Sequence, residues 1–130
     1  MSGLLRQSIR FGVVGAVNTG VGLAAIYGLM FFAGAAPAAA NLAGYLLGMG
    51  VGFGLNRSWT FASGRPVADL LPRYVLVLAL AYLANLAAVL AATSRLAWNP
   101  YLAQLAGIAL YTFVAFLGCR RFVFARRVAA

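Results

Sequence analysis

Four long apolar stretches alternate along the chain with short segments that hold most of its basic and turn-forming residues. The stretches run over residues 11–32, 37–55, 71–92 and 98–118. A helix that rises about 1.5 Å per residue crosses roughly 30 Å of hydrocarbon in about 20 residues. Each stretch therefore predicts a membrane-spanning helix, and the chain is expected to form a single all-α integral membrane domain over residues 1–130.

Three prolines lie near the predicted helix starts. Pro37 and Pro100 fall where the second and fourth helices begin, a position that suits proline because the first helical turn has no intrahelical partner for its N–H groups. Pro72, followed by Arg73, interrupts only the beginning of the third stretch. The prolines therefore mark helix ends and do not divide the spans.

The composition agrees with a lipid environment. Of the 130 residues, 65% are hydrophobic and 8% are charged, whereas about a quarter of the residues of a soluble domain are charged. The formal net charge of +9 first suggests a nucleic-acid partner. The arginines, however, lie at the edges of the apolar stretches, where they meet lipid headgroups, and no base-stacking module is present. We expect a membrane protein with no nucleic-acid partner.

All ten basic residues are arginines, and their placement predicts the orientation of the spans. With four spans, the N-terminus, the middle segment and the C-terminus share one side of the membrane. That side holds nine arginines, namely Arg6, Arg10, Arg57, Arg65, Arg73, Arg120, Arg121, Arg126 and Arg127, and the other side holds only Arg95. Because basic residues are retained on the cytoplasmic side, both termini are predicted to be cytoplasmic.

A cleaved signal peptide is the alternative interpretation of the first stretch. The small residues at 33–40 favour it, but the apolar part of a signal peptide is usually about 7–15 residues long. The run at 11–32 is longer, so we favour an uncleaved helix.

Side chains used in catalysis are nearly absent from the sequence. Asp69 is the one acidic residue, Cys119 is the one cysteine, and the chain has no His and no Lys. One chain therefore offers no nucleophile–base pair, no pair of carboxylates and no multi-cysteine metal site. We expect no enzymatic activity, no metal and no cofactor, and we expect Cys119 to be a small apolar filler near a helix end.

The sequence repeats itself at an offset of 63 residues. Residues 10–61 align with residues 73–124 without a gap, with 16 identities in 52 positions, where roughly one in ten is expected by chance in a sequence this rich in Ala and Leu. The identical pairs include Arg10 with Arg73, Pro37 with Pro100, Gly44 with Gly107, and Arg57 with Arg120. Each repeat holds two spans and ends on the side where it starts. This arrangement predicts two parallel-topology, two-helix repeats related by a pseudo-two-fold axis along the membrane normal.

Such an axis predicts a site between the two halves at the cytoplasmic interface. The site would gather Arg10, Arg57, Arg73 and Arg120, whose guanidinium groups bind phosphate in bidentate geometry. The alternative is that arginines only set the topology and anchor headgroups. We prefer that alternative for Arg6, Arg65, Arg126 and Arg127. For Arg57 and Arg120, which recur beside an aromatic residue in each repeat, both interpretations stay open.

Five polar side chains within the spans are predicted to line a path for sugar hydroxyls: Asn18, Asn41, Tyr45, Asn85 and Gln104. Amides in lipid need hydrogen-bond partners, so the four amide side chains are expected to face the bundle interior. The alternative is interhelical hydrogen bonding that only holds the bundle together.

Glycine recurs at every fourth residue of the second stretch, at Gly44, Gly48 and Gly52. A small residue at this spacing lets another helix backbone approach closely. We expect this face to support helix association beyond the monomer, and hence a homo-oligomer.

Three segments of the chain are distinctive: Arg10-Phe11 before Gly15 and Asn18, the segment Asn-Arg-Ser-Trp-Thr-Phe at 56–61, and the segment Cys-Arg-Arg-Phe-Val-Phe at 119–124. They resemble the GtrA-like family of small membrane proteins, and the resemblance covers nearly the whole chain. The resemblance implies a phosphate or headgroup contact for Asn56 beside the arginines. Cys119 stands where the first repeat has Asn56, so this contact is expected in one half only. The aromatic residues Trp59, Phe61 and Phe122 are expected at the membrane interface.

For function, the resemblance implies a role in cell-surface polysaccharide synthesis or glycosylation. It implies that the chain moves an undecaprenyl- or other polyprenyl-phosphate-linked monosaccharide across the cytoplasmic membrane, with a membrane-associated glycosyltransferase as partner. One alternative is a non-transporting scaffold for that enzyme. A small multidrug-type exporter is another, and the absence of any Glu argues against it.

Overall fold

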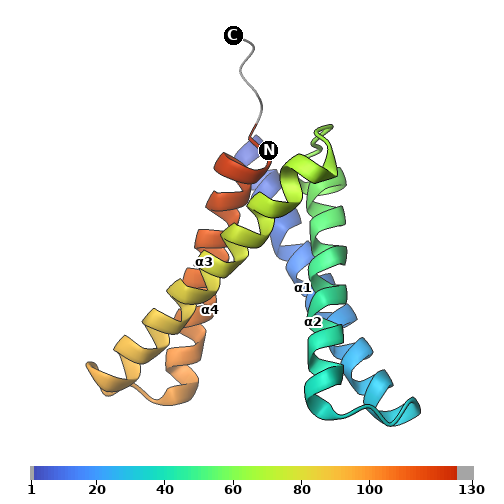
Figure 1. Ribbon diagram of the computed structural model, residues 1–130. Helices are drawn as coiled ribbons and strands as arrows, with labels where there is room; N and C mark the ends of the chain where they lie inside the picture. The colour runs from blue at the N-terminus through green and yellow to red at the C-terminus, as the bar shows by residue number, and fades with distance from the viewer. Residues whose placement is uncertain (1, 126–130) are drawn as a thin grey trace. The chain divides into compact units, whose positions relative to one another are not determined.

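The computed structural model describes residues 2–125, and all of their regular secondary structure is helical (Figure 1). In chain order the elements are α1 (Gly3–Phe32), α2 (Pro37–Leu55), the π-helical turn η1 (Asn56–Thr60), α3 (Val67–Ser94), α4 (Pro100–Gly118) and the π-helical turn η2 (Cys119–Val123). All four α-helices are long and apolar enough to cross a membrane. The predicted all-α class with four spans is confirmed. Arg126 and Arg127 lie outside the described residues.

The helix starts follow from local chemistry at each N-terminus. The Oγ of Ser2 accepts a hydrogen bond of 3.2 Å from the N–H of Leu5, so α1 begins eight residues earlier than its apolar stretch. Pro37 and Pro100 occupy the first turns of α2 and α4, as predicted. The third helix begins before Pro72 and continues through it, because a proline near a helix start removes a single backbone donor.

The chain divides into two compact units, one up to Gly64 and one from Arg65 onward. In the first unit α1 packs against α2 and η1, and in the second α3 packs against α4 and η2. Each unit is therefore a helical hairpin with a π-helical turn at its end. We call them the first and the second hairpin.

The first hairpin is joined along a face of small residues on α2. Gly44, Gly48 and Gly52 are buried there. A Cβ on Gly44 would lie 2.8 Å from the carbonyl oxygen of Gly22 and would collide with Ile26, and a Cβ on Gly48 would lie 2.5 Å from Oδ1 of Asn18. The glycine face therefore serves packing inside the hairpin. The expectation that these glycines support association beyond the monomer is therefore wrong. The homo-oligomer stays a prediction, without support from this face.

The second hairpin buries small residues at the matching positions, 63 residues later. Ala103, Gly107 and Ala115 of α4 are buried, as are Ala40, Gly44 and Gly52 of α2. Gly107 packs against Asn85 and Val89 of α3, which correspond to Gly22 and Ile26 of α1. The duplication itself stays a prediction, and these matched contacts support it.

Candidate functional site

The arginine near the start of α1 lies against the end of the same hairpin. Nη1 of Arg10 donates a hydrogen bond of 2.9 Å to the carbonyl oxygen of Trp59, and its guanidinium carbon lies 5.0 Å from the centroid of the Trp59 ring. Beside this contact, the rings of Phe11 and Phe61 meet edge to face, with centroids 6.3 Å apart. Arg10 is thus held by a carbonyl, an aromatic ring and its position on α1.

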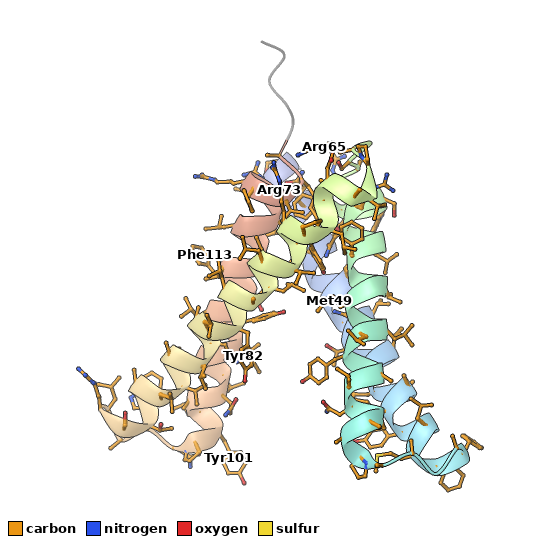
Figure 2. All side chains as sticks on the ribbon, in the orientation of Figure 1. Met49, Arg65, Arg73, Tyr82, Tyr101 and Phe113 are labelled. Carbon is orange, nitrogen blue, oxygen red and sulfur yellow. The ribbon has the colours of Figure 1, made fainter. Side chains whose placement is uncertain are left out.

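The second hairpin holds the same arrangement. Nη1 of Arg73 donates a hydrogen bond of 3.4 Å to the carbonyl oxygen of Phe122, and the guanidinium carbon lies 5.1 Å from the centroid of the Phe122 ring. Figure 2 labels Arg73 near the start of α3. The ring centroids of Tyr74 and Phe124 are 6.4 Å apart. Four residues in each hairpin therefore meet at the same positions, 63 residues apart.

The chemistry of a helix end explains why arginine stands at these two positions. The last carbonyl groups of a helix have no intrahelical donor, and the partial negative charge of the helix dipole lies on them. In both hairpins the first helix brings a guanidinium to the last carbonyls of the second. Arg65 does the same for η2, because its Nη1 lies 3.5 Å from the carbonyl oxygen of Val123 and 3.4 Å from that of Ala125. Arg65, which we assigned only to topology, also closes the end of its hairpin.

The two π-helical turns have equivalent backbone hydrogen bonds but differ in their buried side chains. The N–H of Phe61 donates to the carbonyl of Asn56, and the N–H of Phe124 donates to that of Cys119. In η1 the buried residues are Asn56 and Thr60, and in η2 the buried residues at the same positions are Cys119 and Val123. Cys119 is thus a small buried filler, as the sequence predicted.

Asn56 and Thr60 have polar side chains whose oxygens have no hydrogen-bond partner in the described part of the chain. Both residues are 3% exposed. Within residues 2–125, neither Oδ1 of Asn56 nor Oγ1 of Thr60 has a hydrogen-bond partner. Sequence reasoning selected Asn56 but missed Thr60. The signal in the sequence was the pair of polar residues four apart in the first repeat, where the second repeat has Cys and Val.

The remaining headgroup candidates lie in the same turns. Arg57 and Arg120 are half-buried. Trp59 and Phe122 are 40% and 43% exposed, whereas Phe61 is half-buried. The predicted headgroup residues therefore fall into two clusters, one at the end of each hairpin. In residues 2–125 no group of three or more His, Cys, Asp or Glu could hold a metal ion.

The predicted sugar path separates into two kinds of residue. Asn18 and Asn85 are half-buried and lie against Gly48 and Gly107 of the neighbouring helix. Three others are exposed: Asn41, Tyr45 and Gln104. Asn41 and Gln104 are therefore not packed inside their own hairpins, and the inward-facing amide in the bundle stays a prediction for them. The buried seam of α2 includes Ala40 and Gly44, which leaves Asn41 on another face.

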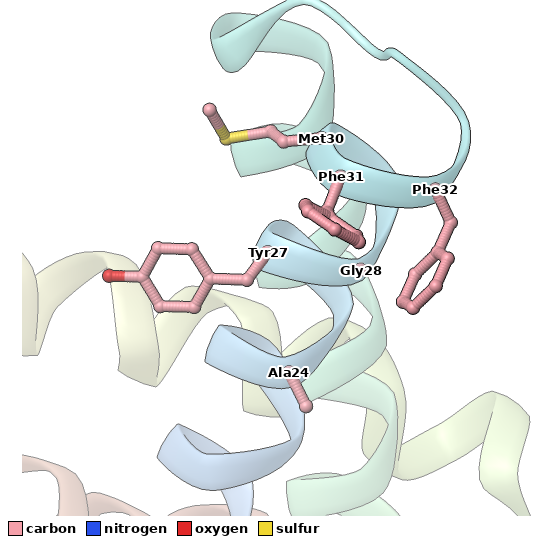
Figure 3. Close-up of a pocket in the computed structure, with 6 residues that line it drawn as sticks. All are labelled: Ala24, Tyr27, Gly28, Met30, Phe31 and Phe32. Atoms are coloured by element: carbon pink, nitrogen blue, oxygen red, sulfur yellow. The ribbon is translucent and has the colours of Figure 1, made fainter.

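An apolar hollow lies at the other end of the first hairpin, at the C-terminus of α1 (Figure 3). Its lining comes from Ala24, Tyr27, Gly28, Met30, Phe31 and Phe32. The rings of Phe31 and Phe32 meet edge to face with centroids 5.0 Å apart, and both side chains are more than 80% exposed. This hollow offers apolar contact but no charged group, so it does not form part of a phosphate site.

Comparison with known proteins concerns the same part of the chain. The family model described as "GtrA/DPMS, transmembrane domain" matches residues 10–124. No curated protein and no solved structure matches the chain. The matched range begins at Arg10 and ends at Phe124, so it includes both clusters at the hairpin ends.

Proposed function

This chain belongs to the GtrA/DPMS transmembrane-domain family, and we propose that it moves a polyprenyl-phosphate-linked monosaccharide across the cytoplasmic membrane. The family is linked to lipid-linked sugars, and the chain is a multi-pass membrane protein. The observation on which the proposal rests is the guanidinium held at the end of each hairpin, by Trp59 for Arg10 and by Phe122 for Arg73. The cargo would support cell-surface polysaccharide synthesis or glycosylation.

The held guanidinium groups suit the phosphate of such a lipid. A guanidinium has five N–H donors, and the hydrogen bond from Arg10 to the Trp59 carbonyl uses one on Nη1. The other donors can bind a phosphate oxygen while the aromatic ring keeps the group in place, and a positioned fork loses less entropy on binding than a mobile one. Arg57 and Arg120 stand two residues before Trp59 and Phe122 and would add positive charge to the same clusters.

The proposed path for the sugar uses the exposed polar residues. Asn41, Tyr45 and Gln104 lie in the halves of α2 and α4 that are farthest from the arginine clusters. They offer neutral donors and acceptors to sugar hydroxyls that have left the headgroup site. Asn18 and Asn85, which pack against glycines, would contribute only where the paired helices separate.

The energy source would lie outside the protein. Asp69 is the one carboxylate, and it lies in the first turn of α3, at the arginine-rich end of its hairpin. Proton coupling through an acid in the middle of a span therefore has no residue to use. Transport would follow the gradient of the lipid-linked sugar, with no cofactor. We place both termini in the cytoplasm of a bacterium or archaeon, because the arginines gather on that side.

Reconstitution tests the proposal directly. Purified protein in liposomes should speed the appearance of a polyprenyl-phosphate glucose in the outer leaflet. Arg10→Gln and Arg73→Gln should each lower the rate roughly tenfold, the loss expected for one hydrogen bond to a charged group. Arg95→Gln, at the opposite end of its hairpin, is the matched control and should leave the rate unchanged. If the polyprenyl-phosphate glucose reaches the outer leaflet no faster in liposomes with wild-type protein than in empty liposomes, the transport function is contradicted.

A scaffold for a membrane-associated glycosyltransferase is the second candidate function. Only 6% of the residues in the most apolar part of α1 are buried, which leaves a long apolar helix surface for lipid or for a partner protein. Cells with the arginine variants separate the two functions. Loss of sugar transfer with normal glycosyltransferase level and localisation supports transport, whereas loss of the enzyme from the membrane supports the scaffold.

A further inference from the structure

We infer that Asn56 and Thr60 form a subsite for a sugar hydroxyl in the first hairpin, and that the second hairpin is a structural counterpart without such a subsite. The inference rests on the proposed function and specifies which half of the protein recognises the sugar. It would make the two hairpins unequal in function although they match in packing.

The two side chains are buried at a cost that nothing in their own hairpin offsets. Each is 3% exposed, and Oδ1 of Asn56 and Oγ1 of Thr60 have no hydrogen-bond partner in the part of the chain that the structure describes. An unpartnered polar atom loses its hydration on burial and gains nothing in return. The pair is therefore ready to accept a ligand atom.

The second hairpin shows that the fold does not require these polar groups. Cys119 and Val123 occupy the matching positions, are fully buried, and end the hairpin with the same π-helical turn. The ring contact and the arginine contact beside them are also the same. Apolar residues of similar size therefore fill this place without loss of packing. The polar pair in the first hairpin needs another explanation, and ligand binding provides one.

The pair lies beside the guanidinium that would bind the phosphate. Gly48 of α2 faces Asn18 of α1. Since the two helices run in opposite directions with the same rise per residue, eight residues further along α2 correspond to eight residues back along α1. Asn56 is thus level with Arg10. The carbonyl that accepts from Arg10 belongs to Trp59, the neighbour of Thr60 in sequence. A phosphate on Arg10 would place its attached sugar next to the polar pair.

The chemistry of the unpartnered atoms distinguishes a sugar from a phosphate. Oδ1 of Asn56 is an acceptor and needs a donor, and a phosphodiester group has only acceptor oxygens. A sugar hydroxyl both donates and accepts, so it can satisfy the amide oxygen and the threonine hydroxyl together. Both residues lie in the last turn of the hairpin, and the ends of helices open locally at low cost. A hydroxyl can therefore reach them without separation of α1 from α2.

Binding of two matched lipids tests the inference. The probes are two polyprenyl phosphodiesters of equal charge, one with a glucosyl group and one, referred to as the bare phosphate, with a methyl group in its place. Each is titrated into detergent-solubilised full-length protein and followed by native mass spectrometry. Wild-type protein should bind the glucosylated lipid roughly tenfold more tightly than the bare phosphate, as expected for one to two additional hydrogen bonds. The variant with Asn56→Leu and Thr60→Val, which keeps side-chain size, should bind both lipids equally. Cys119→Ala, at the matching position of the second hairpin, should keep the wild-type preference.

The outcomes separate this inference from the proposed function. If wild-type protein binds neither lipid, both fail. If wild-type protein prefers the glucosylated lipid and the double variant keeps that preference, the hydroxyl subsite is wrong and the proposed function stands. Binding of the bare phosphate shows that the double variant is folded. If the double variant does not bind the bare phosphate, the test uses the single isosteric change Thr60→Val. A weaker preference of that variant for the glucosylated lipid supports the subsite, and an unchanged preference overturns it.

Discussion

Arg10 and Trp59 are 49 residues apart in sequence and in direct contact, through a 2.9 Å hydrogen bond to the Trp59 carbonyl and a guanidinium placed over the Trp59 ring. The contact joins the start of α1 to the end of η1. It gives Arg10 a structural role, because the side chain closes a hairpin, and in the function that we propose the same side chain also offers donors to an anionic lipid. Arg73 and Phe122 repeat the contact at 3.4 Å.

The two arginine contacts are expected to differ in strength. Trp binds a cation more strongly than Phe, and the hydrogen bond of Arg10 is the shorter of the two. Arg10→Gln should therefore lower the unfolding free energy by about 1 kcal/mol and Arg73→Gln by less. A double-mutant cycle of Arg10→Gln with Trp59→Leu, followed by thermal unfolding in lipid-free detergent, should give a coupling of about 0.5–1 kcal/mol. Additive effects would show that the ring does not hold the arginine.

The N-cap residues of α2 and α4 offer a matched pair of substitutions. Oδ1 of Asn99 accepts a 2.8 Å hydrogen bond from the N–H of Tyr101, whereas Ala36, at the matching position with a similar extended backbone, has no side-chain cap. Asn99→Ala should cost about 1 kcal/mol of unfolding free energy, and Ala36→Asn should add a similar amount. Thermal unfolding in detergent measures both. A destabilising Ala36→Asn would show that the two helix starts are not equivalent.

Two glycines on α2 should respond oppositely to alanine. A methyl group on Gly44 would lie 2.8 Å from the Gly22 carbonyl oxygen, so Gly44→Ala should lower the unfolding free energy by about 1–3 kcal/mol through overpacking. Gly50 has nothing within 4 Å of an added Cβ. Gly50→Ala should be neutral or stabilising by up to about 1 kcal/mol, because alanine has the higher helix propensity. Equal effects at the two sites would contradict the packing of α2 against α1.

Reporter fusions test the orientation of the spans. A fluorescent protein that matures only in the cytoplasm should be active when it is fused to either terminus. A periplasmic phosphatase should be active when it is inserted between Phe32 and Pro37 or beside Arg95. The reverse pattern would place the arginine clusters in the outer leaflet and would overturn the headgroup site as we propose it. Single cysteines at the two termini, between Phe32 and Pro37 and beside Arg95, tested with a membrane-impermeant thiol reagent, provide an independent control.

The sequence by itself determined the class of fold and the number of spans. Apolar stretches of about 20 residues have one stable form in lipid, since every backbone polar group must find its partner within the segment. The positions of Pro37 and Pro100 fixed two helix starts for a similarly local reason. The offset of 63 residues was also visible, because the paired residues are identical or alike in type. The GtrA-like resemblance rested on segments that the family match includes.

Only the tertiary structure decided which face of each helix is buried. The spans are apolar on all sides, so hydropathy does not distinguish a helix face that meets lipid from one that meets another helix. The glycine face of α2 was therefore assigned to association beyond the monomer, whereas it packs against α1. For the same reason the sequence did not show that Asn41 and Gln104 are exposed or that Thr60 is buried beside Asn56. Contacts across a hairpin depend on the axial register of its two helices. That register is set by the packing of side chains that are many residues apart in sequence.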